Sequence, residues 1–201
     1  MARVKSRVRR GAAPGRVRII AGRLRGSVLE VPDRPGLRPT PNRLRETLFN
    51  WLQPALPGAR CLDLFAGSGA LGIEALSRGA GAVQLVERDA GLAEALRVNL
   101  QRLGPGLDAC VHGGDATGFL DAADAAPFDI VFVDPPFAAE LWEPVSARLE
   151  AGGWLAPQAL IYLEMPATMH VTVPSAWNIE RDKCVGDVRA LLYRRRPDPL
   201  S

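Results

Sequence analysis

The sequence predicts an α/β protein built on a mostly parallel sheet with helices on both faces. Short apolar stretches typical of strands alternate with helical segments from residue 61 onward. A glycine-rich turn over residues 65–72 joins the first of these strands to its helix. With 201 residues, 47% of them hydrophobic and 23% charged, the chain suffices for a single core with a small appendage.

Charge divides the chain into a basic head and an acidic body. Residues 1–50 contain thirteen Lys and Arg against three Asp and Glu, whereas residues 51–201 contain twelve against nineteen. Such a basic excess favours a nucleic-acid partner for the head. We expect four segments, namely a basic flexible arm (1–15), a hairpin with a helix (16–57), the α/β domain (58–196) and a tail (197–201).

Composition excludes several other classes of protein. No stretch approaches the roughly 20 apolar residues of a membrane span, and the Arg-rich start lacks the apolar run of a secretory signal. An organelle transit peptide is disfavoured because a strand pattern begins at Arg16. Cys61, Cys110 and Cys184 are far apart and form neither a disulfide framework nor a zinc pair. We therefore expect a soluble, cytoplasmic, monomeric protein without a metal ion.

The head begins with two short β-favouring stretches, residues 17–20 and 28–31, which predict a hairpin. A helix is expected to begin at Thr40 and Pro41, because Thr caps free N–H groups and Pro is tolerated at the first helical position. Its apolar residues lie at helical spacing and predict one buried face, with Arg43 and Arg45 projecting elsewhere. Prolines at 54 and 57 end the helix.

The body contains the alternating elements on which the fold prediction rests. The expected strands cover residues 61–65, 82–87, 108–112, 128–133, 160–164, 177–184 and 188–194, and the expected helices cover 70–79 and 90–103. The last two strands are joined at Val185–Asp187 by a turn typical of a hairpin, so the final strand should run antiparallel to its neighbours.

The glycine turn follows a strand at the edge where open parallel sheets bind ligands. Residues 67–72 match GxGxxG and Glu87 follows twenty residues later, which alone is a dinucleotide pattern and leaves an NAD oxidoreductase open. Asp63 favours a cationic ligand over a pyrophosphate, because a carboxylate attracts an ammonium group. S-adenosylmethionine carries that ammonium and lacks phosphate. Asp115 and Ala116 could then meet its adenine, and Glu87 its ribose hydroxyls.

A second turn, Asp134-Pro135-Pro136-Phe137, follows the strand at 128–133. Two prolines remove two backbone donors and leave their carbonyl acceptors, while the residue before a proline is held extended. Such a turn suits a planar exocyclic amine, whose two N–H groups Asp134 and a prolyl carbonyl would accept as the nitrogen attacks a methyl group. Phe137 can stack on the base.

Together these motifs resemble the RsmD family of bacterial ribosomal RNA methyltransferases. The resemblance covers residues 16–195 in collinear order, and the segment LRPTPNRLRETLFNWL narrows it to this family. It implies a Rossmann-like fold of the class I S-adenosylmethionine-dependent methyltransferases. It also implies methyl transfer to the N2 amine of a guanine in small-subunit (16S) ribosomal RNA, either free or within the 30S particle.

The resemblance also implies roles for individual residues. The expected cofactor residues are Asp63, Phe65, Ala66, Gly67, Ser68, Gly69, Glu87, Arg88, Asp115 and Ala116, joined by Thr40 and Arg43 over the carboxylate end of the cofactor. Asp134, Pro135, Pro136 and Phe137 would bind the target base. The residues expected to contact RNA are Arg16, Arg18, Arg23, Arg25 and Arg38.

Two further functions remain open beside the NAD oxidoreductase. One is an adenine-N6 methyltransferase acting on DNA or RNA, since such enzymes open the same turn with Asp or Asn. The other is an RNA-binding ribosome assembly factor with a vestigial cofactor site. Intact Asp63, Glu87 and Asp134 argue against the assembly factor.

Overall fold

The computed structural model describes residues 15–32, 42–121 and 125–196. The strands are β1 (Gly15–Arg18), β2 (Val28–Val31), β3 (Arg60–Asp63), β4 (Ala82–Glu87), β5 (Ala109–Gly113), β6 (Phe128–Val133), β7 (Leu155–Pro166), β8 (Trp177–Val185) and β9 (Val188–Arg195). The helices are α1 (Asn42–Leu52), α2 (Ala70–Ser77), α3 (Ala90–Leu103), α4 (Ala116–Leu120) and α5 (Trp142–Ala151), with a short 3-10 helix η1 (Phe137–Ala139).

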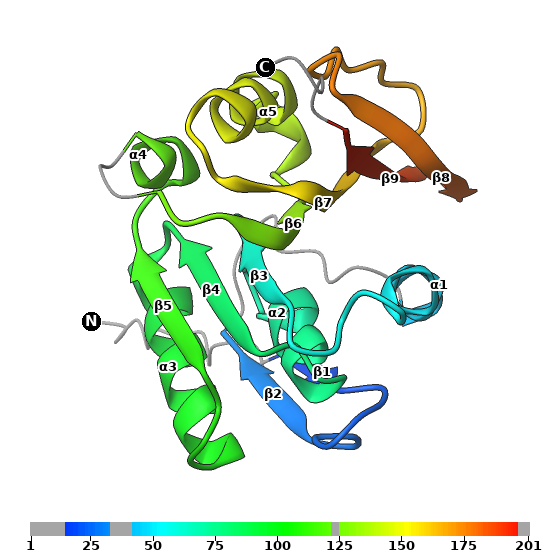
Figure 1. Ribbon diagram of the computed structural model, residues 1–201. Coiled ribbons are helices and arrows are strands. Elements are labelled where there is room, and N and C mark those ends of the chain that lie inside the picture. The colour runs from blue at the N-terminus through cyan, green and yellow to red at the C-terminus, as the bar shows by residue number, and fades with distance from the viewer. Residues whose placement is uncertain (1–14, 33–41, 122–124, 197–201) are drawn as a thin grey trace, which may run out of the picture.

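The described strands form one hairpin and one seven-stranded sheet in the order β5-β4-β3-β6-β7-β9-β8 (Figure 1). Strands β3 to β7 run parallel, and β9 lies antiparallel between β7 and β8. From β3 the chain proceeds outward to β4 and β5 and then returns to β6 on the other side of β3. The gap between β3 and β6 is therefore the switch point, where ligands bind in such sheets. The predicted fold class and the antiparallel last strand are confirmed.

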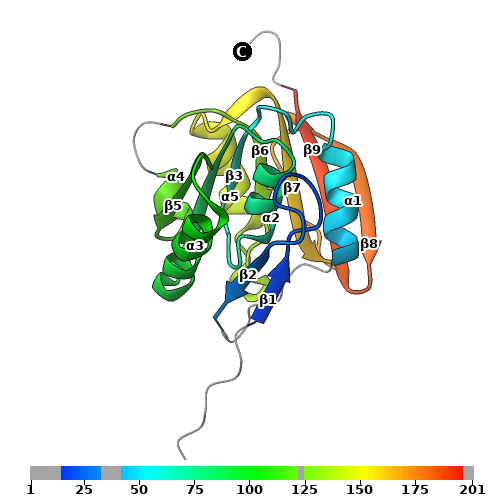
Figure 2. The ribbon, with the colours of Figure 1, turned by 90° about the horizontal axis from the view of Figure 1, so that it is seen from below.

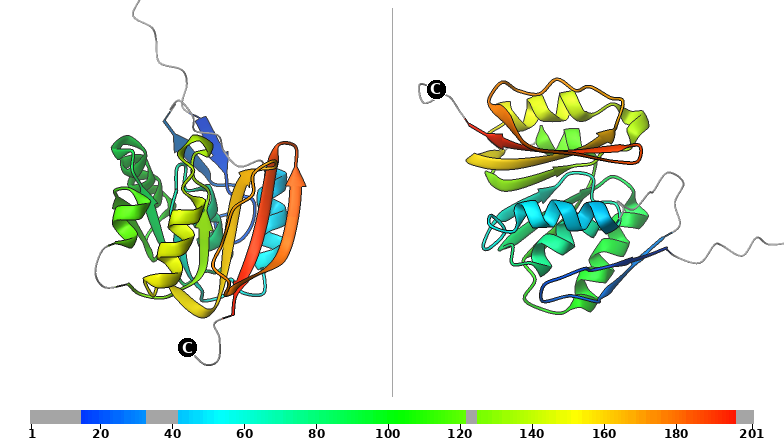
Figure 3. Two further views of the ribbon diagram at one scale, coloured as in Figure 1. Left: turned by 90° about the horizontal axis from the view of Figure 1, so that it is seen from above. Right: turned by 90° about the vertical axis from the view of Figure 1, so that its right-hand side faces the viewer.

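Two apolar layers cover the sheet because successive side chains of a strand point to opposite faces. Cys61 and Ile130 lie in a core cluster with α1, α2, α3 and the hairpin. Their neighbours Leu62 and Val131 lie in a second cluster with α4 and α5. Figure 3, right, shows the sheet between these two layers. In the described part of the chain, no helix is long and apolar enough to span a membrane.

Most predicted elements are confirmed to within a few residues; the differences are an earlier start of β7 and two helices, α4 and α5, outside the predicted helix ranges. Strand β7 begins at Leu155, earlier than predicted, because residue 155 already pairs with Phe128 across a bulge. Helix α4 was not predicted, since five residues are too few to show a helical period. The predicted helix start at Thr40 and Pro41 lies outside the described residues, and α1 is described from Asn42.

The prediction that Arg45 projects away from the core is wrong. Its side chain is 1% exposed, and its Nη2 donates to the carbonyl of Arg18 at 2.9 Å and to Oδ1 of Asn42 at 2.7 Å. Burial lowers the pKa of this guanidinium. The reason is tertiary: the hairpin lies beside α1 (Figure 2), and the Arg18 carbonyl at the end of β1 accepts from the Arg45 guanidinium.

The hairpin is held against α2 and α3 by buried polar side chains. Glu74 of α2 accepts from the N–H groups of Ile20 and Ala21 at 2.7 and 3.0 Å, and its own side chain is fully buried. Ser77 Oγ accepts from Leu24 N–H at 2.9 Å. Asn99 of α3 bonds the backbone of Glu30 in both directions. The backbone of the hairpin is thereby fixed to the helix that follows the glycine turn.

Candidate functional site

The predicted site residues come together where the parallel strands β5, β4, β3 and β6 end. We call this region the carboxyl edge; it consists of residues 63–69, 87–89, 113–116 and 134–137. Each segment follows one of the four adjacent strands, so loops far apart in the sequence become neighbours. The β3 and β6 segments flank the switch point.

The glycine turn needs its glycines for two physical reasons. Gly67 and Gly69 have φ values of 50° and 77°, in the left-handed region that other residues rarely adopt. A Cβ on Gly69 would lie 2.6 Å from Leu96 Cδ2, and one on Gly72 would lie 2.4 Å from Leu85 Cδ2. These glycines allow the turn to reverse direction and let α2 pack directly on β4 and α3.

Asp63 ends β3 beneath this turn. It is 2% exposed, and its Oδ2 accepts from Gly72 N–H at 3.0 Å. Burial, against the opposing backbone hydrogen bonds from Gly72 and Phe65 and with a smaller contribution from the Glu87 carboxylate, raises the pKa of Asp63 to about 7. A cation placed here would favour the ionised form and lower that pKa.

Glu87 ends β4 and fixes the first glycine of the turn. Its Oε2 accepts from Gly67 N–H and its Oε1 from Asp89 N–H, both at 2.8 Å, and the residue is 9% exposed. A carboxylate has about four lone-pair sites, so two ribose hydroxyls could still donate to Glu87. The neighbouring Arg88 is exposed.

Asp115 after β5 is engaged locally. Its Oδ1 accepts from Thr117 Oγ1 at 2.6 Å and from Gly118 N–H at 2.8 Å, so it caps α4, and these bonds lower its pKa. Its side chain is exposed, while Ala116 is buried at the start of the helix. These two bonds do not use all the lone pairs of the carboxylate, so Asp115 can accept further hydrogen bonds.

The turn after β6 presents acceptors in a rigid frame. Pro135 is buried, Asp134 is half-buried, and Pro136 is exposed. The carbonyl of Pro136 already accepts from Ala139 N–H at 2.8 Å, which favours Pro135 as the prolyl acceptor for a ligand. Phe137 is 38% exposed, and its ring lies 6.2 Å from that of Trp142. An exposed aromatic ring beside an acceptor turn can stack on a planar base.

The remaining predicted residues are distributed around this edge. Phe65 is half-buried, and Ala66 and Ser68 are buried within the glycine turn. Arg43 is exposed on the first turn of α1. Thr40 and Arg38 lie outside the described residues.

Sequence reasoning missed one carboxylate, Glu164. It lies near the end of β7, is 5% exposed, and accepts a hydrogen bond from Tyr162 Oη at 2.8 Å. Because Val133 of β6 pairs with Leu163 of β7, Asp134 and Glu164 occupy the next positions on adjacent strands. The sequence signal was an acidic residue ending the predicted strand 160–164, as Glu87 ends the predicted strand 82–87.

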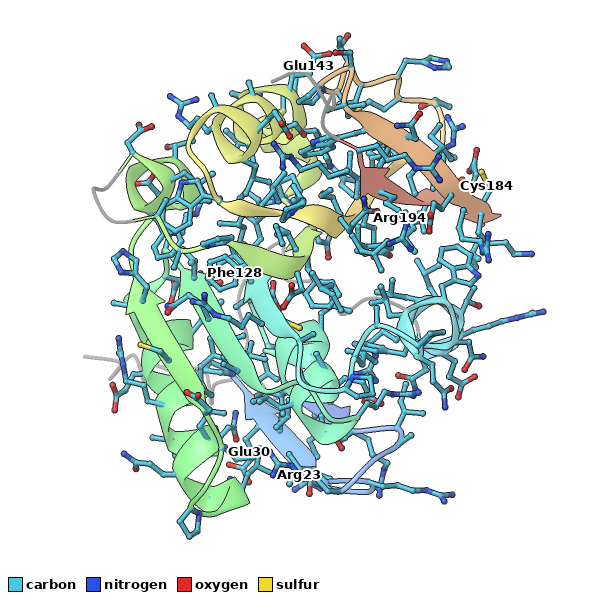
Figure 4. All side chains as sticks on the ribbon, viewed as in Figure 1. Arg23, Glu30, Phe128, Glu143, Cys184 and Arg194 are labelled. Atoms are coloured by element: carbon cyan, nitrogen blue, oxygen red, sulfur yellow. The ribbon has the colours of Figure 1, made fainter. Side chains whose placement is uncertain are left out.

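The four described arginines of the hairpin are all exposed, but they lie at different distances from the carboxyl edge. Arg16 lies opposite Glu30 in the register of β1 and β2. The next two residues of the chain, Val31 and Pro32, lie beside Gly67 and Ser68. Arg23 and Arg25 are at the hairpin tip beside the carboxyl end of α2, where Arg23 N–H bonds the Ser77 carbonyl. Figure 4 shows Arg23 at the lower end of the molecule. Only the Arg16 end of the hairpin adjoins the carboxyl edge.

Among residues 15–32, 42–121 and 125–196, no group of three or more His, Cys, Asp or Glu side chains is arranged to hold a metal ion. Asp63, Glu87 and Asp134 line the carboxyl edge from three different strands. Side by side with the prolyl carbonyls, they form an acceptor-rich site suited to ammonium, hydroxyl and amine donors.

The chain is similar to several known proteins over most of its length. The model of the family described as "Conserved hypothetical protein 95" matches residues 17–194. The Escherichia coli (strain K12) protein named "Ribosomal RNA small subunit methyltransferase D" is 50% identical over 182 residues, covering 90% of this chain and 91% of that protein. Its Haemophilus influenzae namesake is 45% identical, covering 90% and 95%. The solved structure "Putative methyltransferase yhhF from Escherichia coli" has a TM-score of 0.83 at 48% identity, covering 92% and 100%.

Proposed function

The chain belongs to the RsmD family, and from that premise we propose that it transfers a methyl group from S-adenosylmethionine to the N2 amine of a guanine in small-subunit ribosomal RNA. The observation that carries this proposal is the acceptor turn Asp134–Phe137, which lies beside the glycine turn at the switch point of the sheet. This pairing brings an amine site next to a site for a cationic cofactor.

The residues of the carboxyl edge fit the cofactor by charge and by hydrogen-bond type. Asp63 faces the turn with a carboxylate that an ammonium group would stabilise. Glu87 accepts from the ribose hydroxyls, and the segment Asp115–Ala116 meets the adenine. When bound, S-adenosylmethionine supplies an electrophilic methyl group on a sulfonium centre.

Asp134 and the carbonyl of Pro135 act on the guanine amine. Each accepts one N–H of N2, which orients the nitrogen for in-line attack and stabilises the positive charge that develops on it. Phe137 stacks on the base plane. The methylated nitrogen then becomes acidic and releases a proton, so Asp134 serves mainly as a positioning acceptor.

The hairpin is the proposed RNA contact. Its arginines Arg16, Arg18, Arg23 and Arg25 are exposed on a backbone that Glu74 and Asn99 hold in place. Arg16 would neutralise RNA phosphates near the target base, and the other three would neutralise phosphates further along the RNA. A monomer acting on ribosomal RNA, without a metal ion, would work in the bacterial cytoplasm.

The deciding experiment is mass mapping of the modified nucleotide after the protein is incubated with S-adenosylmethionine and unmethylated small subunits. We expect a single N2-methylguanine in the ribosomal RNA. Methylation of adenine in DNA or RNA would favour the adenine-N6 alternative, and cofactor binding without turnover would favour the assembly factor. Calorimetry with NAD and S-adenosylmethionine separates the oxidoreductase from both.

A further inference from the structure

We propose that Glu164 reads the N1–H of the target base and is the residue that selects guanine over adenine. This inference rests on the proposed function and adds the base-selecting group to it. The turn Asp134–Phe137 cannot make that choice alone, because it recognises only an exocyclic amine, which adenine, cytosine and guanine all carry. A second group must therefore read the ring nitrogen beside the amine.

Strand register places Glu164 next to that turn. Val133 pairs with Leu163, so Asp134 and Glu164 are the following residues of two parallel strands, which lie about 4.8 Å apart. Phe132 and Tyr162 both belong to the core cluster that contains α1 and α2. Side chains two residues further along project to the same face, so both carboxylates project toward the α1–α2 side of the sheet.

The chemistry of Tyr162 supports this placement. Its hydroxyl donates to Glu164 Oε2 at 2.8 Å. Burial raises the pKa of Tyr162 well above its usual value, and the charges of Glu164 and Asp134 raise it further. The two carboxylates thus lie within electrostatic reach of one hydroxyl.

Glu164 is held firmly enough to discriminate between bases. Its side chain is buried, and its backbone carbonyl accepts from Trp142 Nε1 at 2.7 Å. The same indole lies 6.2 Å from the ring of Phe137, so one side chain braces both the strand and the base-stacking residue. Tyr162 is itself fully buried against Phe132. A buried carboxylate fixed in this way favours a ligand that donates hydrogen bonds.

Guanine is the base whose edge matches this set of acceptors. It presents three donors side by side, N1–H and the two N–H bonds of N2. Asp134 and the Pro135 carbonyl accept the amine hydrogens, and Glu164 accepts N1–H. Adenine and cytosine place a ring lone pair beside their amine, which would face the Glu164 carboxylate without a proton between them. Sites built on such a hydrogen bond reject the analogue that lacks it by several orders of magnitude.

The test uses a base that lacks the N1–H of guanine together with its 6-oxo group, so the comparison of the unaltered protein with Glu164→Gln isolates the N1 hydrogen bond. 2-Aminopurine keeps the 2-amine but has an unprotonated N1, and it can be incorporated at the mapped target position of the RNA. We expect the unaltered protein to methylate guanine at least about 100-fold better than 2-aminopurine by kcat/KM. In Glu164→Gln, activity on guanine should fall by a similar factor and the preference should shrink toward unity, because an amide can donate to N1. The dissociation constant of S-adenosylmethionine should not change.

Two further variants control for indirect effects. Glu94→Gln makes the same chemical change on an exposed side chain of α3 and should leave rate and preference unchanged. Tyr162→Phe removes the donor that orients Glu164 and should weaken the preference by a smaller factor, which also decides the matter if Glu164→Gln does not fold. The inference is overturned if the unaltered protein accepts 2-aminopurine as well as guanine, or if Glu164→Gln or Tyr162→Phe keeps the full preference. Absence of any N2-methylguanine would instead overturn the proposed function.

Discussion

The carboxyl edge and the hairpin place their charges in opposite ways. At the edge and on the adjacent strand β7, three carboxylates are buried and each accepts a hydrogen bond from a fixed donor, namely Asp63, Glu87 and Glu164. On the hairpin, Arg16 and Arg25 reach into solvent, and it is the backbone that is fixed. Buried charges recognise particular atoms because their positions cannot adjust, whereas exposed charges attract any phosphate within about a Debye length.

This difference predicts how each region responds to substitution. Removing one partner of a buried ion pair leaves the other charge unpaired and costs several kcal/mol. An exposed arginine contributes little to stability, and its effect on RNA affinity depends on salt.

The largest effect is expected at the acceptor turn Asp134–Phe137. Asp134→Ala should lower the methyl-transfer rate by about 10²–10³-fold, as loss of one preorganised group does in other sites, and should keep the affinity for S-adenosylmethionine. Single-turnover kinetics with calorimetry on the cofactor measures both. Asp108→Ala, a change at an exposed aspartate, is the control. Joint loss of binding and transfer would mean that Asp134 belongs to the cofactor site.

The next effect tests how the hairpin is attached. Glu74→Gln removes the buried charge that Arg78 Nε meets at 2.7 Å and that two hairpin N–H groups share. We expect a loss of about 3 kcal/mol in the free energy of unfolding. The affinity for RNA should fall by a larger factor than the affinity for S-adenosylmethionine. Denaturant titration and RNA binding assays measure the two effects, with Glu94→Gln as the control. Unchanged stability would show that the hairpin is held by its apolar contacts alone.

The same contrast explains what could be predicted from the sequence. The apolar strands, the glycine turn and the acceptor turn are local patterns, so the sheet and most of its edge could be predicted. Arg45 could not, because its burial depends on a contact with the Arg18 carbonyl of the hairpin that no helical period reveals. Glu164 carried a local signal, but only the register of β6 and β7 places it beside Asp134. Contacts between segments that are distant in the sequence could not be predicted, because no local pattern reveals them.

A pH experiment tests the buried carboxylate of Asp63. The pKa of Asp63 is about 7 in the folded protein and about 3.9 in an unfolded chain. Because the folded value is the higher one, the folded state holds the proton more tightly, and stability is lost as pH rises from about 4 through 7. Asp63→Asn should remove this loss and be more stable than the unaltered protein by about 4 kcal/mol at pH 8, with little difference near pH 4.

Thermal denaturation across this pH range measures the effect of Asp63→Asn. The variant should also bind S-adenosylmethionine more weakly at pH 8, since it lacks the charge that faces the ammonium. A pH-independent difference between the two proteins would mean that Asp63 stays ionised throughout. In that case the hydrogen bonds from Gly72 and Phe65 would outweigh its burial.

The smallest effect per residue is expected on the hairpin. If about four phosphate contacts form, log affinity for RNA should fall with log salt at a slope of roughly −3 to −4, and each Arg→Ala change should reduce that slope by just under one unit. Arg16→Lys and Arg25→Lys should keep the slope, because screened contacts depend on charge more than on shape.

Glu164→Asp, by contrast, keeps its charge and should still lose the preference for guanine, because its carboxylate can no longer reach the same position. An RNA affinity that does not change with salt would contradict the role of the arginines, and a guanine preference retained in Glu164→Asp would remove the distinction between the two regions.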